Sequence, residues 1–173
     1  MSTRFFNLPA AVLLLLFVTS VSMSQGNFKK PEPINNETVN MMLGKWEAEP
    51  YEVFGSKRSE SVNYYLDFGG QFLVCDIEGK EESGYTYKSK VILKIEKDGS
   101  FTGWSFDDWG NVGTYTGKAS GNKMTASGKR DNSTDEREFT INGNTMTSNV
   151  SVTMKWSDGQ DKTINQVVTL NKK

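Results

Sequence analysis

Apolar and polar residues alternate along much of the chain with a period of two. Between positions 85 and 96 apolar side chains fall mainly on odd positions, and charged side chains gather on even positions. The segments 146–156 and 164–170 repeat the pattern, with the apolar side chains on even positions. This alternation predicts strands with one dry and one wet face, which is typical of antiparallel sheets.

Turn signals separate these segments at regular intervals. Glycine stands beside Gly, Asn or Asp at positions 69–70, 98–99, 110–111, 121–122, 142–143 and 158–159. Such dipeptides admit the positive φ that tight hairpins need. We expect about ten strands, with boundaries good to a few residues. They lie near 45–53, 60–67, 71–77, 85–96, 100–106, 112–118, 123–129, 136–141, 145–156 and 162–171.

Strands in this number, each with one dry face, must close into a barrel or pack as two sheets. Closure removes the exposed edges that invite aggregation. The prediction is therefore an all-β fold, an antiparallel up-and-down β-barrel of about 8–10 strands, with a two-sheet sandwich as the alternative. A short helix from Glu37 to Leu43 precedes the first strand, with Asn36 as its N-cap and Gly44 as its stop.

The first 24 residues differ from the rest of the chain. They carry one charge, Arg4, then an apolar run from Leu8 to Val18, then small residues that include Ser22 and Ser24. This order predicts a secretory signal peptide, residues 1–24, cleaved before Gln25. The alternative, an uncleaved anchor, would need about 20 apolar residues, more than this run has. We expect a flexible segment at 25–35, a single barrel domain at 36–173, and an exported protein, periplasmic or extracellular, with no membrane segment after cleavage.

The charge balance argues against polyanionic partners. The chain has 20 basic and 21 acidic residues, and loss of Arg4 with the signal peptide lowers the net charge from −1 to −2. Nucleic acids and anionic membrane surfaces both favour proteins with a basic excess. We therefore expect no nucleic-acid partner.

The numbers of cysteine and histidine residues further limit the kinds of chemical site that the chain can form. Cys75 is the only cysteine, so no internal disulfide can form, and its apolar neighbours favour a buried small hydrophobe over a reactive thiol. The chain has no histidine, which removes the usual metal ligand, the usual general base and the commonest haem ligand. We expect no metal, no haem and no other cofactor.

A series of short motifs carries a resemblance to a known family. Leu43-Gly44-Lys45-Trp46 follows the predicted helix, Trp104-Ser-Phe-Asp107 and Gly113-Thr-Tyr-Thr-Gly117 come later, and the chain ends in Lys172-Lys173. The series, over most of residues 37–173, resembles the lipocalin-like (calycin) barrels of an uncharacterised, mostly bacterial family, domain-of-unknown-function family 1579. The resemblance implies a barrel with an internal cavity and no established activity. It also implies structural roles for Gly44 and Trp46, whose indole packs across the closed end beneath a basic side chain of the last strand.

Aromatic residues are frequent, at 12% of the chain. Those predicted to face inward are Tyr64, Phe72, Tyr85, Tyr87, Phe139 and Trp156. In a small barrel such side chains either fill the interior or line a pocket. A barrel of about eight strands already leaves room for one small ligand, so both possibilities stay open.

Arg137 is the most informative charged residue. Alternation with Phe139 and Ile141 points it inward, where it would need a carboxylate or a ligand because an unpaired buried charge costs several kcal/mol. Ser148 and Gln166 on neighbouring strands would complete a polar spot. The interpretation that we favour is that Arg137 lies at the barrel mouth in water, beside Glu136 and Glu138.

These observations favour a binding protein for a small, mostly apolar ligand, a fatty acid or similar amphiphile. The expected ligand-binding residues are Arg137, Tyr87, Val91, Val152, Met154 and Gln166. No catalytic residues are predicted, because Asp107-Asp108 precede a turn signal and are better suited to shaping that turn. Two alternatives remain: an isomerase-like barrel enzyme using Arg, Asp and Tyr, and a structural or interaction module with a packed core.

Overall fold

The computed structural model describes residues 29–53, 55–156 and 159–173. The chain divides into two units at Pro31, and the second unit, Glu32–Lys173, contains the fold. The predicted signal peptide and its cleavage point before Gln25 lie outside the described residues. Of the expected flexible segment 25–35, residues 29–35 are described and contain no helix or strand.

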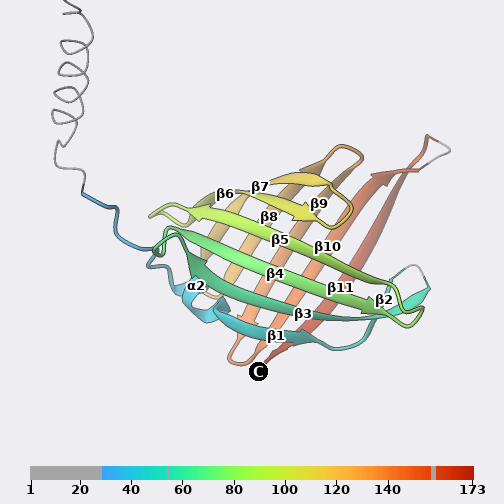
Figure 1. Cartoon of the computed structure of the whole chain (residues 1–173), viewed down its shortest axis with the longest axis horizontal. Helices are drawn as coiled ribbons and strands as arrows, with labels where there is room; N and C mark the ends of the chain where they lie inside the picture. Colours follow the sequence, from blue (N-terminus) through green and yellow to red (C-terminus); the bar gives the residue numbers. More distant parts are fainter. Residues whose placement is uncertain (1–28, 54, 157–158) are drawn as a thin grey trace, which may run out of the picture. The chain divides into compact units, whose positions relative to one another are not determined.

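The second unit is a closed antiparallel β-barrel with one short helix (Figure 1). Its elements are α2 (Glu37–Met42), β1 (Gly44–Ala48), β2 (Tyr51–Val53), β3 (Ser56–Asp67), β4 (Phe72–Glu81), β5 (Thr86–Ile95), β6 (Ser100–Asp107), β7 (Val112–Ser120), β8 (Lys123–Arg130), β9 (Ser133–Asn142), β10 (Thr145–Lys155) and β11 (Asp161–Lys172). Each strand from β3 to β11 pairs with the next, and β1 closes the ring of ten by pairing with both β11 and β3. The predicted up-and-down barrel is confirmed, and the sandwich alternative is wrong.

The first predicted strand, 45–53, is two strands in the structure. Pro50 lies between β1 and β2, and a proline has no backbone N–H to donate to a sheet ladder. After this break β2 pairs with β3, and Tyr51 lies opposite Arg58. β3 begins at Ser56, four positions before the predicted start at 60. This earlier start brings Arg58 into the barrel wall.

Helix α2 lies against one end of the barrel. Asn36 accepts a hydrogen bond from Val39 N (3.1 Å), as the predicted N-cap requires. The Thr38 hydroxyl donates to Gly121 O (2.7 Å) in the β7–β8 turn, and Val39 and Met42 are buried. The helix therefore closes the barrel end that carries this turn.

Trp46 forms the core of that closed end. Its side chain is fully buried, and its Nε1 donates to Met42 O at 2.7 Å. Lys172 Nζ lies 5.1 Å from the centre of the indole ring and donates to Met41 O. A lysine of the last strand thus covers the tryptophan, and its cation also satisfies a carbonyl near the end of the helix.

Two of the aromatic residues predicted to face inward do not. Phe72 alternates with the buried Leu73, lies on the outer face and packs edge-on against Phe68. Trp156 comes directly after the end of β10, is 41% exposed, and carries Lys162 over its ring. Strand alternation no longer orients a side chain once the strand has ended, which explains the error at Trp156. Cys75 is buried in the core, as expected for a small hydrophobe.

Candidate functional site

The barrel encloses a cavity of about 400 Å³. Met42 of α2 lines it at the closed end, and Tyr85, Asp107 and Trp109 line it toward the opposite end. Most of the side chains between these ends are apolar. Small-molecule pockets in proteins have volumes of about 300–1,000 Å³, so the cavity has the size of a site for one small ligand. The interior is therefore not the packed core expected for a structural or interaction module.

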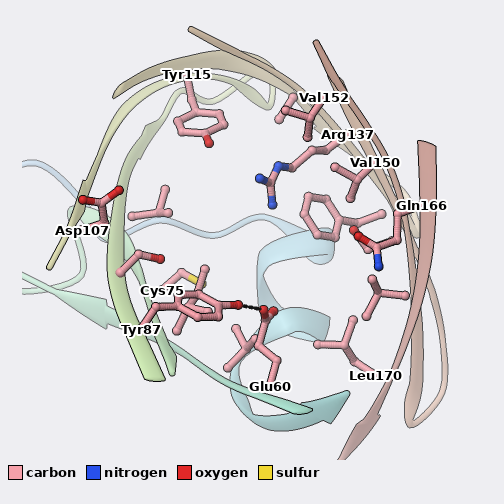
Figure 2. A pocket seen from close by; sticks show the side chains of 18 of the residues that line it. Glu60, Cys75, Tyr87, Asp107, Tyr115, Arg137, Val150, Val152, Gln166 and Leu170 are labelled. Carbon is pink, nitrogen blue, oxygen red and sulfur yellow. Dashed lines mark hydrogen bonds between the residues drawn. The ribbon is translucent and has the colours of Figure 1, made fainter. Parts of the chain in front are cut away.

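All the ligand-binding residues predicted from the sequence line this cavity. They are Arg137, Tyr87, Val91, Val152, Met154 and Gln166, and Ser148 lines it as well. Figure 2 shows Arg137 close to Val150 and Val152 on one wall, with Tyr87 on the facing wall. The structure brings these side chains into one cavity, and their role in binding a ligand stays a prediction.

Arg137 projects into the cavity with 28% of its side chain exposed (Figure 2). Its Nε donates to Asp135 Oδ2 at 2.5 Å, and Asp135 is 4% exposed. The two residues share a face because they stand two positions apart on β9. Burial opposes the guanidinium charge, but Tyr115, Asp135 and Glu60 outweigh burial and raise the pKa of Arg137. The guanidinium is therefore charged. Its place on the cavity wall corrects the interpretation that Arg137 lies in water at the barrel mouth.

The polar spot around Arg137 has other members than those predicted. Tyr115 donates its hydroxyl to Asp135 Oδ1 (3.3 Å), and Arg130 Nη2 lies 3.5 Å from that hydroxyl. Gln166 instead donates its amide to Glu52 O at 2.9 Å, on the adjoining β2. Among the described residues, Asp135 is the only hydrogen-bond acceptor for Arg137, and it uses Nε. Both terminal nitrogens of the guanidinium are thus available to a ligand.

Gly128 makes room for this group on β8. A Cβ at position 128 would lie 2.4 Å from Asp135 Oδ1 and 2.6 Å from Tyr115 Cε1. Any larger residue would therefore displace the carboxylate or the phenol ring. A glycine in the middle of a strand often marks such a close approach.

A second polar group is centred on Glu60 of β3, on the wall that faces Arg137 (Figure 2). Glu60 Oε2 accepts hydrogen bonds from the hydroxyls of Tyr51, at 2.9 Å, and Tyr87. Burial and the nearby Glu60 charge raise the pKa of Tyr51 to about 12 and also raise the pKa of Tyr87. Both phenols are therefore neutral donors at neutral pH.

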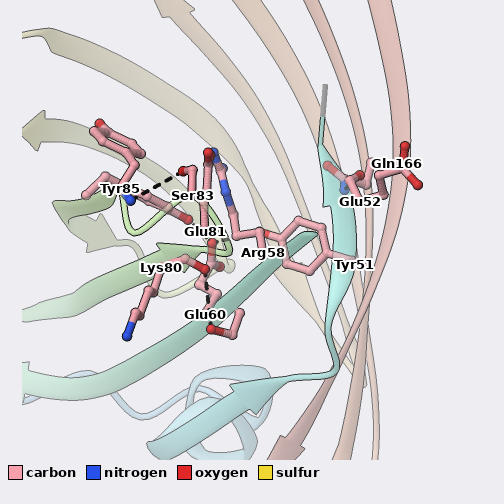
Figure 3. Close-up of polar contacts among 11 residues, drawn as sticks. Tyr51, Glu52, Arg58, Glu60, Lys80, Glu81, Ser83, Tyr85 and Gln166 are labelled. Atoms are coloured by element: carbon pink, nitrogen blue, oxygen red, sulfur yellow. Dashed lines mark hydrogen bonds and ion pairs between the residues drawn. The ribbon is translucent and has the colours of Figure 1, made fainter. Parts of the chain in front are cut away.

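Tyr87 owes its position to Gly79 and Arg58. Gly79 faces it across β4 and β5, where an added Cβ would lie 1.9 Å from Tyr87 Cε1. Arg58 lies with its guanidinium carbon 4.6 Å from the Tyr87 ring centre and pairs with Glu81 (Nη2–Oε1 2.5 Å; Figure 3). Arg58 Nε is buried without a hydrogen-bond partner among the described residues. The phenol is held between these two neighbours with its hydroxyl directed to Glu60.

The open end carries aromatic and turn residues. Trp109 is 73% exposed and packs edge-on against Tyr85, with ring centres 6.1 Å apart. Asp107 Oδ1 accepts from the backbone N–H groups of Trp109 and Asn111. Burial raises the pKa of Asp107, but hydrogen bonds from Asn111 and Trp109 outweigh it, and the net shift is downward. Asp107 therefore shapes the turn, as the sequence predicted.

The sequence did not identify the charged residues that contact the predicted ligand-binding residues Tyr87 and Arg137. Glu60 was inside the predicted strand 60–67, and its alternation with Val62 and Tyr64 already indicated an inward direction. Arg58 lies before the predicted start of that strand and would have needed an earlier one. Asp135 fell one position before the predicted strand 136–141. The strand glycines, Gly79 and Gly128, were the available signals for crowded positions on the inner face.

Comparisons with known proteins agree on the fold alone. No family model and no curated protein matches the chain, so membership of the lipocalin-like family stays a prediction. The crystal structure of Rv2717c from M. tuberculosis is similar over 78% of this chain and 94% of that chain, with a TM-score of 0.62 and 14% identity.

Two engineered barrels also align with the chain. The redesigned β-barrel mFAP1, solved bound to DFHBI, covers 80% of this chain and 100% of its own, with a TM-score of 0.45 and 10% identity. A fluorescence-activating β-barrel designed de novo gives the same coverage and identity, with a TM-score of 0.40.

The described residues contain neither a helix suited to crossing a membrane nor a cluster of metal ligands. No helix there has the length and apolar character needed to cross a membrane. No group of three or more His, Cys, Asp or Glu side chains in the same residues is placed to hold a metal ion.

Proposed function

We propose that the protein is an exported binding protein that holds a small, mostly apolar amphiphile with an acid group inside the barrel. The observation that carries the proposal is a charged Arg137 whose terminal nitrogens face a largely apolar cavity of about 400 Å³. The apolar lining would take the tail of the ligand, and Arg137 would take its carboxylate.

Two physical arguments support this division of roles. Burial of apolar surface contributes about 0.8 kcal/mol for each CH₂ group, so a tail lying along Val91, Val152 and Met154 would supply much of the affinity. A guanidinium meets a carboxylate with two parallel hydrogen bonds. Asp135 occupies the Nε side of Arg137, which leaves the end-on approach through the two terminal nitrogens.

The test compares straight-chain fatty acids with primary alcohols of the same length, by isothermal titration calorimetry. The wild-type barrel should bind the acid more tightly than the alcohol. In the double variant Asp135→Asn/Arg137→Leu the acid should lose about 2–5 kcal/mol of binding free energy, because its charge would be buried without a partner. Alcohol binding should stay unchanged, which shows that the cavity is intact.

Asp135→Asn alone is the matched control, because it keeps Arg137 and should retain acid binding. If wild type and double variant bind the acid equally well, the carboxylate clamp is wrong. If wild type binds neither acid nor alcohol, the proposed function is wrong.

The barrel-enzyme alternative gains one specific observation, the half-buried Glu60 beside the cavity. A carboxylate with neutral tyrosine donors nearby is a suitable base for removing a proton next to a carbonyl group. Incubation of small enolisable ketones with the protein in deuterium oxide tests this directly. Glu60-dependent deuterium uptake, followed by mass spectrometry, would favour the enzyme over the binding protein.

A further inference from the structure

Two charged side chains on the cavity wall, Arg137 and Arg58, are held in close ion pairs, whereas Glu60, which also lines the cavity, is not. Arg137 is paired with Asp135, and Arg58 is paired with Glu81, each at 2.5 Å. Glu60 has no lysine or arginine nitrogen within 4.0 Å in the part of the chain that the structure describes. An anionic group without a cationic partner therefore stands beside an apolar cavity.

The hydrogen bonds to Glu60 leave one of its oxygens open. Tyr51 and Tyr87 both donate to Oε2, and no described residue donates to Oε1. The phenols are neutral, so they orient the carboxylate without cancelling its charge. Electrostatic attraction between opposite charges is several times stronger in a partly buried site than in water. A cation that reached Oε1 would gain both this attraction and a charge-assisted hydrogen bond.

The positions of the neighbouring residues define where that cation can approach. The Tyr87 ring lies against Gly79, and the guanidinium carbon of Arg58 lies 4.6 Å from the ring centre. Arg58 therefore already fills the space next to the Tyr87 ring, and Glu81 balances its charge. The cavity side of Glu60 remains, on the wall that faces Arg137 (Figure 2).

We infer that Glu60, oriented by Tyr51 and Tyr87, forms a second polar subsite that binds a protonated amine of the ligand. Because Arg137 faces this subsite, a molecule that used both would be an amphiphile with an acid and an ammonium group separated by an apolar chain. The inference rests on the proposed function only in placing the ligand inside the barrel, since the amine subsite does not require the Arg137 clamp.

The test uses straight-chain primary alkylamines and primary alcohols of equal length at neutral pH, measured by calorimetry. Wild type should bind the amine at least tenfold more tightly than the alcohol. In Glu60→Gln the amine should lose this advantage, while alcohol binding stays the same. The side-chain oxygen of glutamine can still accept from both tyrosines, so the substitution removes the charge and preserves the local hydrogen bonds.

Glu78→Gln is the matched control. Glu78 lies on the neighbouring strand β4, 62% exposed and paired with Lys88, and alternation directs it outward. It changes the net charge by the same amount and should leave amine binding as in wild type. An equal loss in both variants would mean a general charge effect and would overturn the subsite.

The outcomes separate the inference from the proposed function. Acid binding that depends on Arg137, together with amines that bind no better than alcohols, would keep the function and overturn the amine subsite. Glu60-dependent amine binding without any acid binding would support the subsite and overturn the acid clamp. If acids, amines and alcohols all fail to bind wild type, both are overturned.

Discussion

Asp135 changes what the removal of Arg137 is expected to do. If Arg137 had no ion-pair partner, Arg137→Leu should leave the fold intact, because the substitution exchanges a buried charge for an apolar group. Asp135 is 4% exposed, however, and would lose its ion pair. Among the described residues, only the Tyr115 hydroxyl would still donate to its side chain. Breaking a buried pair by removing one partner costs about 3–5 kcal/mol.

We therefore expect the two single substitutions to lower the free energy of unfolding by different amounts. Arg137→Leu should destabilise the barrel by about 3–5 kcal/mol, and Asp135→Asn by less, because the guanidinium can be hydrated in the cavity. The double variant should recover most of the loss. Urea unfolding of the four proteins measures the cycle, and additive losses would show that the pair is not coupled.

The raised pKa of Tyr51 predicts how the stability of the barrel changes at alkaline pH. Its pKa is raised to about 12 in the folded protein, by burial and by Glu60, from about 10 in an unfolded chain. A raised pKa contributes stability that is fully present below pH 10 and is lost as the pH rises toward 12. The contribution is on the order of 2 kcal/mol, because one pKa unit corresponds to about 1.4 kcal/mol and Tyr51 is partly exposed.

Unfolding free energies measured between pH 8 and about 12 should fall less steeply in Tyr51→Phe than in wild type. The phenylalanine has no proton to lose, so its contribution cannot change over this range. Identical slopes in the two proteins would contradict the assigned shift.

At the scale of the strand, Gly79 and Tyr87 act as one unit across β4 and β5. Gly79→Ala would place a Cβ 1.9 Å from Tyr87 Cε1, so the ring must move away from the wall and its hydroxyl from Glu60. Overpacking of this kind costs about 1–3 kcal/mol. In a Tyr87→Ala background the same substitution should cost little, because the ring is absent. Thermal unfolding of the four variants tests the coupling, and an equal cost in both backgrounds would rule it out.

The elements also show which parts of the molecule can be inferred from sequence. Period-two alternation and turn glycines are local signals, and they predicted the barrel. Asn36 and Gly44 predicted the ends of the helix. Alternation also pointed Arg137 inward, although the favoured interpretation placed it at the barrel mouth. The ends of strands are harder to predict from sequence, and the break at Pro50 and the early start of β3 were missed. The roles of Arg58, Tyr51 and Asp135, which lie near strand ends, were missed for this reason. Pairings between distant strands, such as Trp46 with Lys172, depend on closure of the ring and have no local signal.

At the scale of the whole chain, we propose that residues 1–24 direct export and are then removed. The reason is the short apolar run between Arg4 and Ser22, which is too short to span a bilayer easily. Protein recovered from a secreting host should begin at or within a few residues of Gln25, as read by mass spectrometry. Leu14→Arg, which interrupts the apolar run, should keep the protein inside the cell. An exported protein with an intact Met1 would contradict cleavage.

The size of the cavity predicts how affinity depends on ligand length. Each added CH₂ that enters the barrel should strengthen fatty-acid binding by about 0.8 kcal/mol, or about fourfold. The gain must stop when the chain fills a space of about 400 Å³, because further carbons would stay in water at the open end. A series from butanoic to hexadecanoic acid should therefore show a rise and then a plateau. Val152→Phe, which adds volume on the cavity wall, should move the plateau to shorter acids while leaving the increment per CH₂ unchanged below it. An affinity that does not vary with length, or a plateau that Val152→Phe fails to move, would show that the tail does not lie in this cavity.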